Sequence, residues 1–149
     1  MARKVVGKLL IAAMLAGLAT MGPGVADAGV ALKSGLYKGK TTQEAVSASF
    51  RNIKFKLKKG KLTLTLEPTV ARESCVSSSV FTDSGNPTVR LSRNRTFTFT
   101  RTFLGNKFDK IHGQFVGPDE VQGYAIYHFF AQDLCSGGRS KVNFTAKHK

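Results

Sequence analysis

Residues 53–66 read IKFKLKKGKLTLTL, in which apolar and polar side chains alternate on both sides of the pair Lys59-Gly60. A period of two is typical of a β-strand that buries one face. A two-residue turn at Lys59-Gly60 would join two such strands into a hairpin and set their register without a slip. The apolar pairs that this register predicts are Leu57 with Leu62, Phe55 with Leu64 and Ile53 with Leu66.

The opposite face of this predicted hairpin is densely basic. Its outward positions and its turn hold Lys54, Lys56, Lys58, Lys59 and Lys61. One interpretation is that these lysines solubilise the sheet and protect its edge from pairing with another chain. The other is an anion-binding patch, whose attraction for a polyanion weakens as salt is added. The sequence favours the first interpretation, and under the second the five lysines are the candidate binding site.

The rest of the chain repeats such short alternating runs between turn residues, and no segment has a convincing helical pattern. The further runs that we interpret as strands are residues 36–41, 45–50, 89–91, 95–103, 108–116, 121–131 and 141–146. About eight short strands with frequent turns predict an all-β fold. An antiparallel β-sandwich is favoured over a small closed β-barrel, because the Ser-rich residues 74–87 would suit a crossover between two sheets.

Two segments carry more specific expectations. The apolar pattern changes face around Arg51-Asn52, which predicts a bulge or bend there. Residues 121–131 carry aromatic side chains on both faces, which is typical of a central strand covered on two sides. We therefore expect Tyr124 and Tyr127 in the core, whereas exposed rings would offer a stacking platform. The predicted partners across the preceding strand are Ile111 with Tyr127, Gly113 with Ala125 and Phe115 with Gly123.

The first 28 residues have the pattern of a cleaved secretory signal peptide. Its parts are a basic start (Arg3, Lys4, Lys8), an apolar run (residues 9–19) and a small-x-small cleavage site (Ala26-Asp27-Ala28). An apolar run of about 11 residues is too short to span a bilayer, which takes about 20. We therefore predict a signal peptide over residues 1–28, a single domain over residues 29–149 and no transmembrane segment after cleavage. Such a protein is secreted or associated with the cell envelope.

The chain is strongly basic, with a formal net charge of +14 at pH 7. The predicted leader holds three of the 23 basic residues and one of the nine acidic residues, so the remaining chain keeps a net charge of +12. Such a charge attracts polyanions but carries no information about the fold. Outside a cell, the expected partner is an anionic envelope polymer or polysaccharide, and no specific nucleic acid is expected. The oligomeric state is left open.

The predicted domain contains two cysteines, Cys75 and Cys135. An even pair in an exported chain most simply forms one disulfide. A zinc site on these cysteines would need histidines at metal-ligand spacing, and the sequence places none near them. We therefore predict a structural disulfide, no metal site and no cofactor.

The sequence offers little for catalysis. Histidine is the usual acid–base residue near neutral pH, and the chain has only His112, His128 and His148. No recognisable motif places a nucleophile beside them. Carboxylates that predicted turns account for are Asp83, Asp109, Asp119, Glu120 and Asp133. We predict that the protein is not an enzyme. A hydrolase would need a cleft in which His112 or His128 approaches a carboxylate.

Two motifs near the ends of the predicted domain are similar to those of a known group. They are GLYKGKTTQ, residues 35–43, and LCSGGRSKVNFTA, residues 134–146. They resemble a family of small secreted actinobacterial all-β proteins of unknown function. That family has a Tyr-x-Gly-x-Thr-x-Gln opening strand and a closing Cys-x-Ser-Gly segment before a Val-x-Trp/Phe-Thr-Ala strand. The chain departs from it at residues 45–52, which are longer, and at Phe144, where tryptophan is common. The resemblance implies an exported, disulfide-linked β-domain and no particular activity.

Taken together, these features predict a secreted or envelope-associated β-domain. Its expected function is non-catalytic binding of an anionic polymer or carbohydrate. The alternatives are a structural or protein-interaction module and, less favoured, a hydrolase.

Overall fold

The computed structural model describes residues 30–43, 50–72, 75–77, 80–83, 85–103, 107–132 and 135–149. The predicted leader and most of the predicted strand at residues 45–50 lie outside these residues. The described strands are β1 (Gly35–Thr41), β2 (Asn52–Lys58), β3 (Lys61–Leu66), β4 (Ala71–Arg72), β5 (Cys75–Val76), β6 (Thr88–Arg90), β7 (Thr96–Phe103), β8 (Lys107–Phe115), β9 (Glu120–Gln132) and β10 (Cys135–His148).

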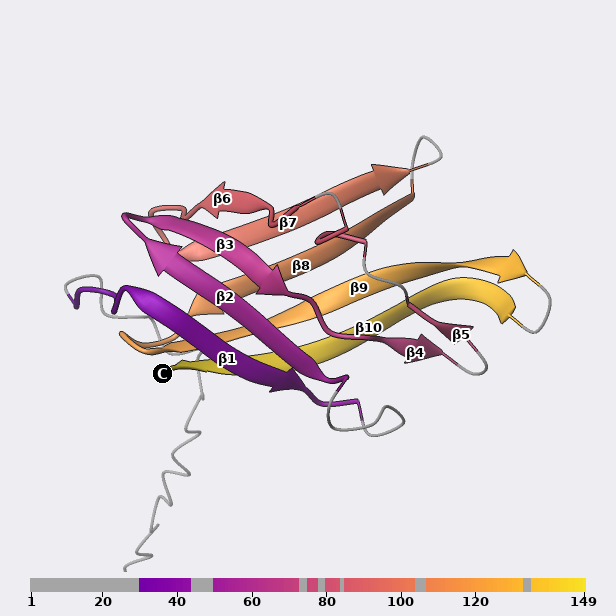
Figure 1. Ribbon diagram of the computed structural model, residues 1–149, viewed down its shortest axis with the longest axis horizontal. Helices are drawn as coiled ribbons and strands as arrows, with labels where there is room; N and C mark the ends of the chain where they lie inside the picture. Colours follow the sequence, from indigo (N-terminus) through magenta and orange to yellow (C-terminus); the bar gives the residue numbers. More distant parts are fainter. Residues whose placement is uncertain are drawn as a thin grey trace, which may run out of the picture.

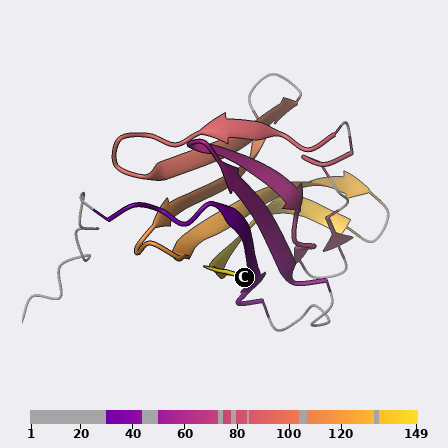
Figure 2. The ribbon, with the colours of Figure 1, turned by 60° about the vertical axis from the view of Figure 1, so that its left-hand side comes forward.

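Eight of these strands form one antiparallel sheet in the order β6-β3-β2-β1-β10-β9-β8-β7, and β4 pairs with β5 in a second, small sheet. The large sheet curls until β6 lies beside β7, so that it is nearly closed and barrel-like (Figure 1, Figure 2). The turn after β6 joins this seam, where the backbone N–H of Ser92 donates to the carbonyl of Thr96 at 2.9 Å. The predicted all-β class is confirmed, and the single curled sheet corresponds to the barrel alternative.

The long segment between β3 and β6 contains the small sheet of β4 and β5 and then returns to the large sheet. There β6 pairs with β3, the strand from which the segment departs. Val70 and Phe81 in this segment are buried, and the Phe81 ring meets the Tyr127 ring edge-on at 6.1 Å. The segment therefore packs on the barrel core, and the crossover that favoured a sandwich is wrong.

The core is filled by the inward side chains of the curled sheet. The largest fully buried ones are Tyr37, Tyr127, Phe55, Phe99, Phe115 and Phe144. The Phe55 ring lies 5.3 Å from Phe97 and 5.6 Å from Phe144, measured between ring centroids. Because these three rings come from β2, β7 and β10, burying them holds both halves of the sheet together.

The predicted hairpin is confirmed at its turn and for most of its register. Lys58 lies opposite Lys61, so Lys59-Gly60 is a two-residue turn. Both turn residues have positive φ, 49° and 70°, which is the geometry of a type I′ turn. The pairs Leu57–Leu62 and Phe55–Leu64 are also as predicted.

The third predicted pair of this hairpin is wrong because β3 carries a bulge. Lys54 rather than Ile53 lies opposite Leu66, so Thr65 is an extra residue on β3. A bulge swaps the faces of the residues that follow it. Leu66 is therefore 36% exposed, and Glu67 turns inward with only 8% exposure. The bulge or bend predicted near Arg51-Asn52 is a turn at Phe50 and Arg51 and not a bulge, since β1 and β2 pair regularly as far as Asn52.

The opening motif of β1 is accounted for by packing and backbone contacts. The Tyr37 hydroxyl donates to the carbonyls of Lys33 at 2.6 Å and Pro118 at 3.1 Å. Burial, and then the charge of Asp119, raises the pKa of Tyr37 to about 12, which keeps the phenol protonated. A Cβ on Gly39 would lie 2.1 Å from the backbone of β10. Tyr37 therefore ties the segment before β1 to the turn between β8 and β9, at the end of the barrel that we call the closed end. Gly39 lets β1 and β10 approach each other closely.

β8 and β9 pair in a register two residues away from the predicted one. Gly113 lies opposite Gly123 instead of Ala125. Added Cβ atoms at these two glycines would lie 2.5 Å from the Phe97 ring and 2.7 Å from the Phe144 ring. The paired glycines therefore let the sheet approach these core rings closely.

At the other end of the barrel the two C-terminal hairpins separate. β8 pairs with β9 from Phe115 back to Lys110, which lies opposite Ile126, and the ladder ends there. β7–β8 and β9–β10 each continue as hairpins and diverge beyond this point (Figure 1). We call this region the splayed end.

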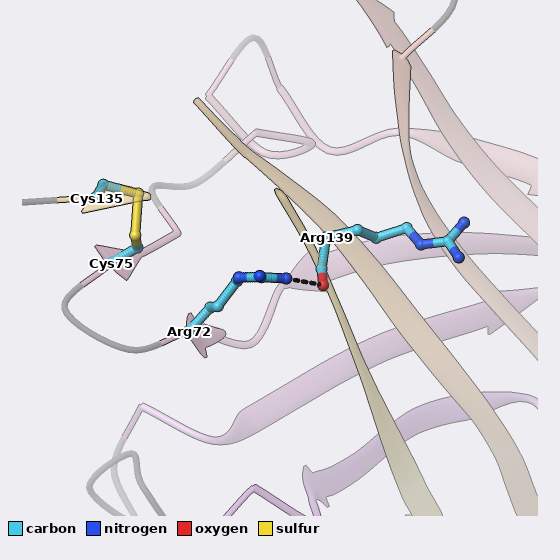
Figure 3. Close-up of a disulfide and its surroundings, with 4 residues drawn as sticks. All are labelled: Arg72, Cys75, Cys135 and Arg139. Carbon is cyan, nitrogen blue, oxygen red and sulfur yellow. Dashed lines mark hydrogen bonds between the residues drawn. A yellow bond between two sulfur atoms is a disulfide. The ribbon is translucent and has the colours of Figure 1, made fainter. Parts of the chain in front are cut away.

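The predicted disulfide is confirmed and lies at the splayed end. Cys75 of β5 is bonded to Cys135 of β10, across 60 residues of sequence. Close by, Nη1 of Arg72 donates to the carbonyl of Arg139 at 2.8 Å. Figure 3 shows both links, which tie the β4–β5 hairpin to the start of β10.

Candidate functional site

The predicted basic hairpin places its lysines on the outer wall of the barrel. Alternation from the buried Ile53 and Phe55 turns the lysines of β2 outward. Lys54 is half-buried, and Lys56, Lys58, Lys59 and Lys61 are exposed.

The neighbouring strands extend this basic surface. Lys38 of β1 lies directly opposite Lys54 of β2 and, on its other side, opposite Lys147 of β10. Lys61 lies opposite both Lys58 and Arg90. We call this set the lysine face; it comprises Lys38, Lys40, Lys54, Lys56, Lys58, Lys59, Lys61 and Arg90.

Little negative charge balances the lysine face. The residues described as β1, β2, β3 and β6 include no carboxylate. Lys147, which borders the face, lies 3.5 Å from Glu120.

Like charges directly opposite one another on paired strands are destabilising. The arrangement can bind a polyanion through many contacts, each weakened by salt.

Among the residues that the structure describes, two carboxylates are buried, both near the splayed end. Glu67 accepts hydrogen bonds from the backbone N–H of Phe81 at 3.2 Å and from the Tyr127 hydroxyl at 3.1 Å. It also accepts the hydroxyl of Thr82 at 3.2 Å and its backbone N–H at 3.4 Å. These four donors surround the carboxylate, which anchors the segment after β5 to the barrel wall.

The second buried carboxylate belongs to Asp109, which is 2% exposed. Its Oδ1 accepts the backbone N–H of His128 at 2.7 Å and lies 3.6 Å from Nδ1 of the same residue. Burial raises the pKa of the Asp109 carboxyl, and the hydrogen bonds and charge of His128 offset part of that rise. In a continued β8–β9 ladder a backbone carbonyl would accept such an N–H. Where β8 leaves β9, the Asp109 carboxylate accepts it instead.

The hydrolase alternative required an imidazole near a carboxylate. Among the described residues, His128 meets that condition through Asp109. His112 instead shares a hydrogen bond of 2.9 Å with the Thr98 hydroxyl, and His148 lies 3.0 Å from the Ser34 carbonyl. The shortest contact of Asp109 is with backbone, so its primary role is structural and hydrolysis stays a hypothesis.

The two tyrosines of β9 differ in environment. Tyr127 is 1% exposed in the core, as predicted. Tyr124 is half-buried on the outer wall, so its predicted core position is wrong. Phe130 on the same outer face is 38% exposed, so this face is not covered over its whole length as predicted.

Among the residues that the structure describes, no three His, Cys, Asp or Glu side chains cluster as a metal site would require. The same residues contain no helix long and apolar enough to cross a membrane. Comparisons with protein-family models, with curated proteins and with solved structures found no match for this chain.

Lys38 and Lys40 were missed as members of the basic surface, although a signal for them exists. They alternate with Tyr37 and Gly39 in the opening motif, so the same period of two assigns them to the outer face. That β1 lies beside β2 was not evident, because strand order is not written in the local pattern.

Proposed function

We propose that this protein is an exported, non-catalytic binding module that holds an anionic polymer of the cell envelope on its lysine face. The observation that supports it is the placement of like charges directly opposite one another, at Lys38–Lys54, Lys58–Lys61 and Lys61–Arg90. A surface that needs only solubility gains nothing from such pairs, which lower the stability of the sheet.

The position of β1 and β2 supports binding over edge protection. Both strands lie inside the sheet with a partner on each side, and the strands at its ends are β6 and β7. Lysines that guard a sheet edge are useful on edge strands. The lysines of β1 and β2 therefore call for another explanation, and a polyanionic ligand provides one.

The conformation of Lys59 gives independent support. Its φ of 49° is in the left-handed region, which type I′ turns usually give to Asn, Asp or Gly. A lysine there is less favourable than those residues by about 1 kcal/mol. The hairpin thus retains a positive charge at its tip at the expense of its own stability, which is common at binding sites.

The partner class follows from the predicted export and from the charge. The Cys75–Cys135 disulfide is compatible with an oxidising extracellular environment. Acidic polysaccharides and other anionic polymers are the polyanions that an exported protein meets at the envelope. The resemblance to secreted actinobacterial proteins agrees with this location.

The test is binding of the processed protein to immobilised alginate over a range of salt concentrations. We expect the variant Lys38→Gln/Lys54→Gln to lose about tenfold or more in affinity at low salt, because each ammonium–anion contact is worth about 1 kcal/mol in water. The matched control is Arg93→Gln/Arg139→Gln, which removes the same charge from two exposed residues outside the lysine face.

A stability measurement makes this test sharper. The same lysine variant should unfold at a higher denaturant concentration than the wild type at low salt, since Lys38 no longer opposes Lys54 and Lys147. High salt should abolish the gain, because it screens exposed charges. Equal loss of affinity in the lysine variant and the control would reject the lysine face as the site.

A further inference from the structure

The outer wall formed by β8, β9 and β10 contains a shallow hollow of about 510 Å³. This volume is within the range of small-molecule sites. Val116, Gly123 and Phe144 line it together with the outward side chains of His112, Gln114, Gln122, Tyr124, Asn143 and Thr145. Gly123 pairs with Gly113 at the place where the sheet approaches the core rings closely.

The strand registers order this lining in two rows across the three strands. Asn143, Tyr124 and His112 lie opposite one another in the first row. Thr145, Gln122 and Gln114 form the second row. The hollow therefore presents one aromatic ring beside a line of amide and hydroxyl groups.

The Tyr124 ring is held in place by its neighbours. Nζ of Lys141 lies over the ring at 4.3 Å from its centroid, and Nζ of Lys110 lies at 5.6 Å. Both lysines lie opposite Ile126, which is two residues after Tyr124 on β9. They therefore flank the ring on the side away from Gln122. Cation–π contacts of this kind restrain a ring that is otherwise half-exposed.

His112 completes the first row as a neutral polar group. Its ring lies 5.3 Å from that of Tyr124 and is fixed by the Thr98 hydroxyl at 2.9 Å. Burial, and then the charge of Lys110, lowers the pKa of His112, so the imidazole is uncharged at neutral pH. Because Nδ1 shares its hydrogen bond with Thr98, Nε2 is the ring nitrogen left to donate to or accept from a ligand.

This chemistry matches a sugar ring. Each hydroxyl of a sugar both donates and accepts hydrogen bonds. The side-chain amides of Gln114, Gln122 and Asn143 match it, because each has a donating NH2 and an accepting oxygen. The apolar C–H face of a pyranose packs against an aromatic ring, which gives affinity and orientation together.

The hollow adjoins the lysine face. Thr145, in its second row, lies directly opposite Lys40 of β1. A polymer that places one residue in the hollow can therefore continue across β1 and β2 along the lysines. We propose that the hollow beside Tyr124 binds a sugar ring of an acidic glycan, so that the anionic ligand of this protein is a polysaccharide. This inference rests on the proposed function for the charged part of the ligand.

The test compares two polyuronates, alginate and polygalacturonate, with polyglutamate, which carries carboxylates but no sugar. The variant is Tyr124→Ala, and the matched control is Ile126→Ala, a neighbouring half-buried residue on the same strand and face. We expect Tyr124→Ala to weaken binding to at least one polyuronate by about tenfold and to leave polyglutamate binding within about twofold. Ile126→Ala should change neither affinity.

A second readout covers the case in which Tyr124→Ala fails to fold. The chain has three tyrosines and no tryptophan, and Tyr37 and Tyr127 are buried. Binding of a polyuronate should therefore change the tyrosine fluorescence of the wild type, and Tyr124→Phe should abolish that change while keeping the fold.

The outcomes separate this inference from the proposed function. Equal loss on polyuronates and polyglutamate in Tyr124→Ala, or a fluorescence change that survives in Tyr124→Phe, would overturn the sugar site alone. Binding to polyglutamate but to neither polyuronate would do the same. Absence of salt-dependent binding to every one of these polyanions would overturn the proposed function as well.

Discussion

The closed end of the barrel and the splayed end are stabilised in different ways. At the closed end, backbone ladders pair the strands and the buried Phe115 ring packs edge-on against Tyr37 at 5.2 Å. At the splayed end, two carboxylates, a disulfide and an arginine make contacts outside the ladders. We infer that regular alternation stabilises the sheet where its strands pair. Where a strand departs from its partner, specific side chains replace the lost backbone contacts.

The largest test of this comparison is removal of the disulfide. In the chain-entropy model a cross-link over 60 residues stabilises the fold by about 4 kcal/mol. We expect Cys75→Ser/Cys135→Ser to lose about that much free energy of unfolding in a denaturant titration. Hydrogen exchange should speed up first in β4 and β5, with the amides of β2 least affected. A loss spread evenly over both ends would contradict the comparison.

The buried carboxylate of Glu67 is the next test. Glu67→Gln keeps the shape of the side chain but removes the charge that four donors share. Hydrogen bonds to charged groups contribute about 1.5–3 kcal/mol, so we expect a loss of that order in free energy of unfolding. Asp83→Asn is the control, because Asp83 is an exposed carboxylate close by in sequence, and its change should stay below about 0.5 kcal/mol. Similar losses in both variants would show that burial of Glu67 is unimportant.

Asp109 gives the splayed end a pH dependence of unusual sign. Because burial raises its pKa in the folded state, the folded protein binds this proton more tightly than the unfolded chain does. Its contribution to stability therefore falls as pH rises from its ordinary value of 3.8 through the raised folded pKa, and is constant above that.

Asp109→Asn isolates this contribution, since asparagine does not titrate. The free energy of unfolding of the wild type minus that of the variant should decrease over this pH window and then level off. Denaturant titrations from about pH 3 to pH 7 provide the measurement. A difference that grows with pH would mean that His128 stabilises the carboxylate more than burial destabilises it.

The contrast between regularly paired strands and strands that leave their partners also explains which features the sequence could predict. The hairpin around Lys59-Gly60 and the disulfide follow from local pattern and cysteine count. The inward turn of Glu67 does not, because it depends on the single extra residue Thr65, which looks like any outward threonine. A bulge changes face without changing composition, so alternation alone places Glu67 wrongly.

The register of β8 against β9 was open for another reason. A slip of two residues keeps every side chain on the same face, so the apolar pattern fits both registers. Contacts with Phe97 and Phe144 favour the pairing of Gly113 with Gly123, and those rings come from other strands. The hollow beside Tyr124 depends on this register, so the sequence could not locate it.

The smallest predicted effect lies in the regular part of the barrel, at the hairpin tip. Lys59 has a φ of 49°, and asparagine adopts this left-handed conformation more readily than lysine. We expect Lys59→Asn to raise the free energy of unfolding by about 0.5–1 kcal/mol. The control Lys58→Asn makes the same chemical change one residue earlier, within β2. Asparagine is disfavoured in a strand, but the change also removes the charge opposite Lys61, so we expect little net change in stability.

Binding measurements on this pair connect the hairpin tip to the lysine face. Each variant removes one positive charge from that face, so both should weaken alginate binding by a similar small factor and reduce its salt dependence. Only Lys59→Asn should gain stability. If Lys59→Asn gains stability and loses affinity while Lys58→Asn loses affinity alone, the lysine at the turn is kept for its charge and not for the fold. Unchanged affinity in both variants would show that Lys59 is not kept for binding. The ligand would then contact only β1 and the middle of β2.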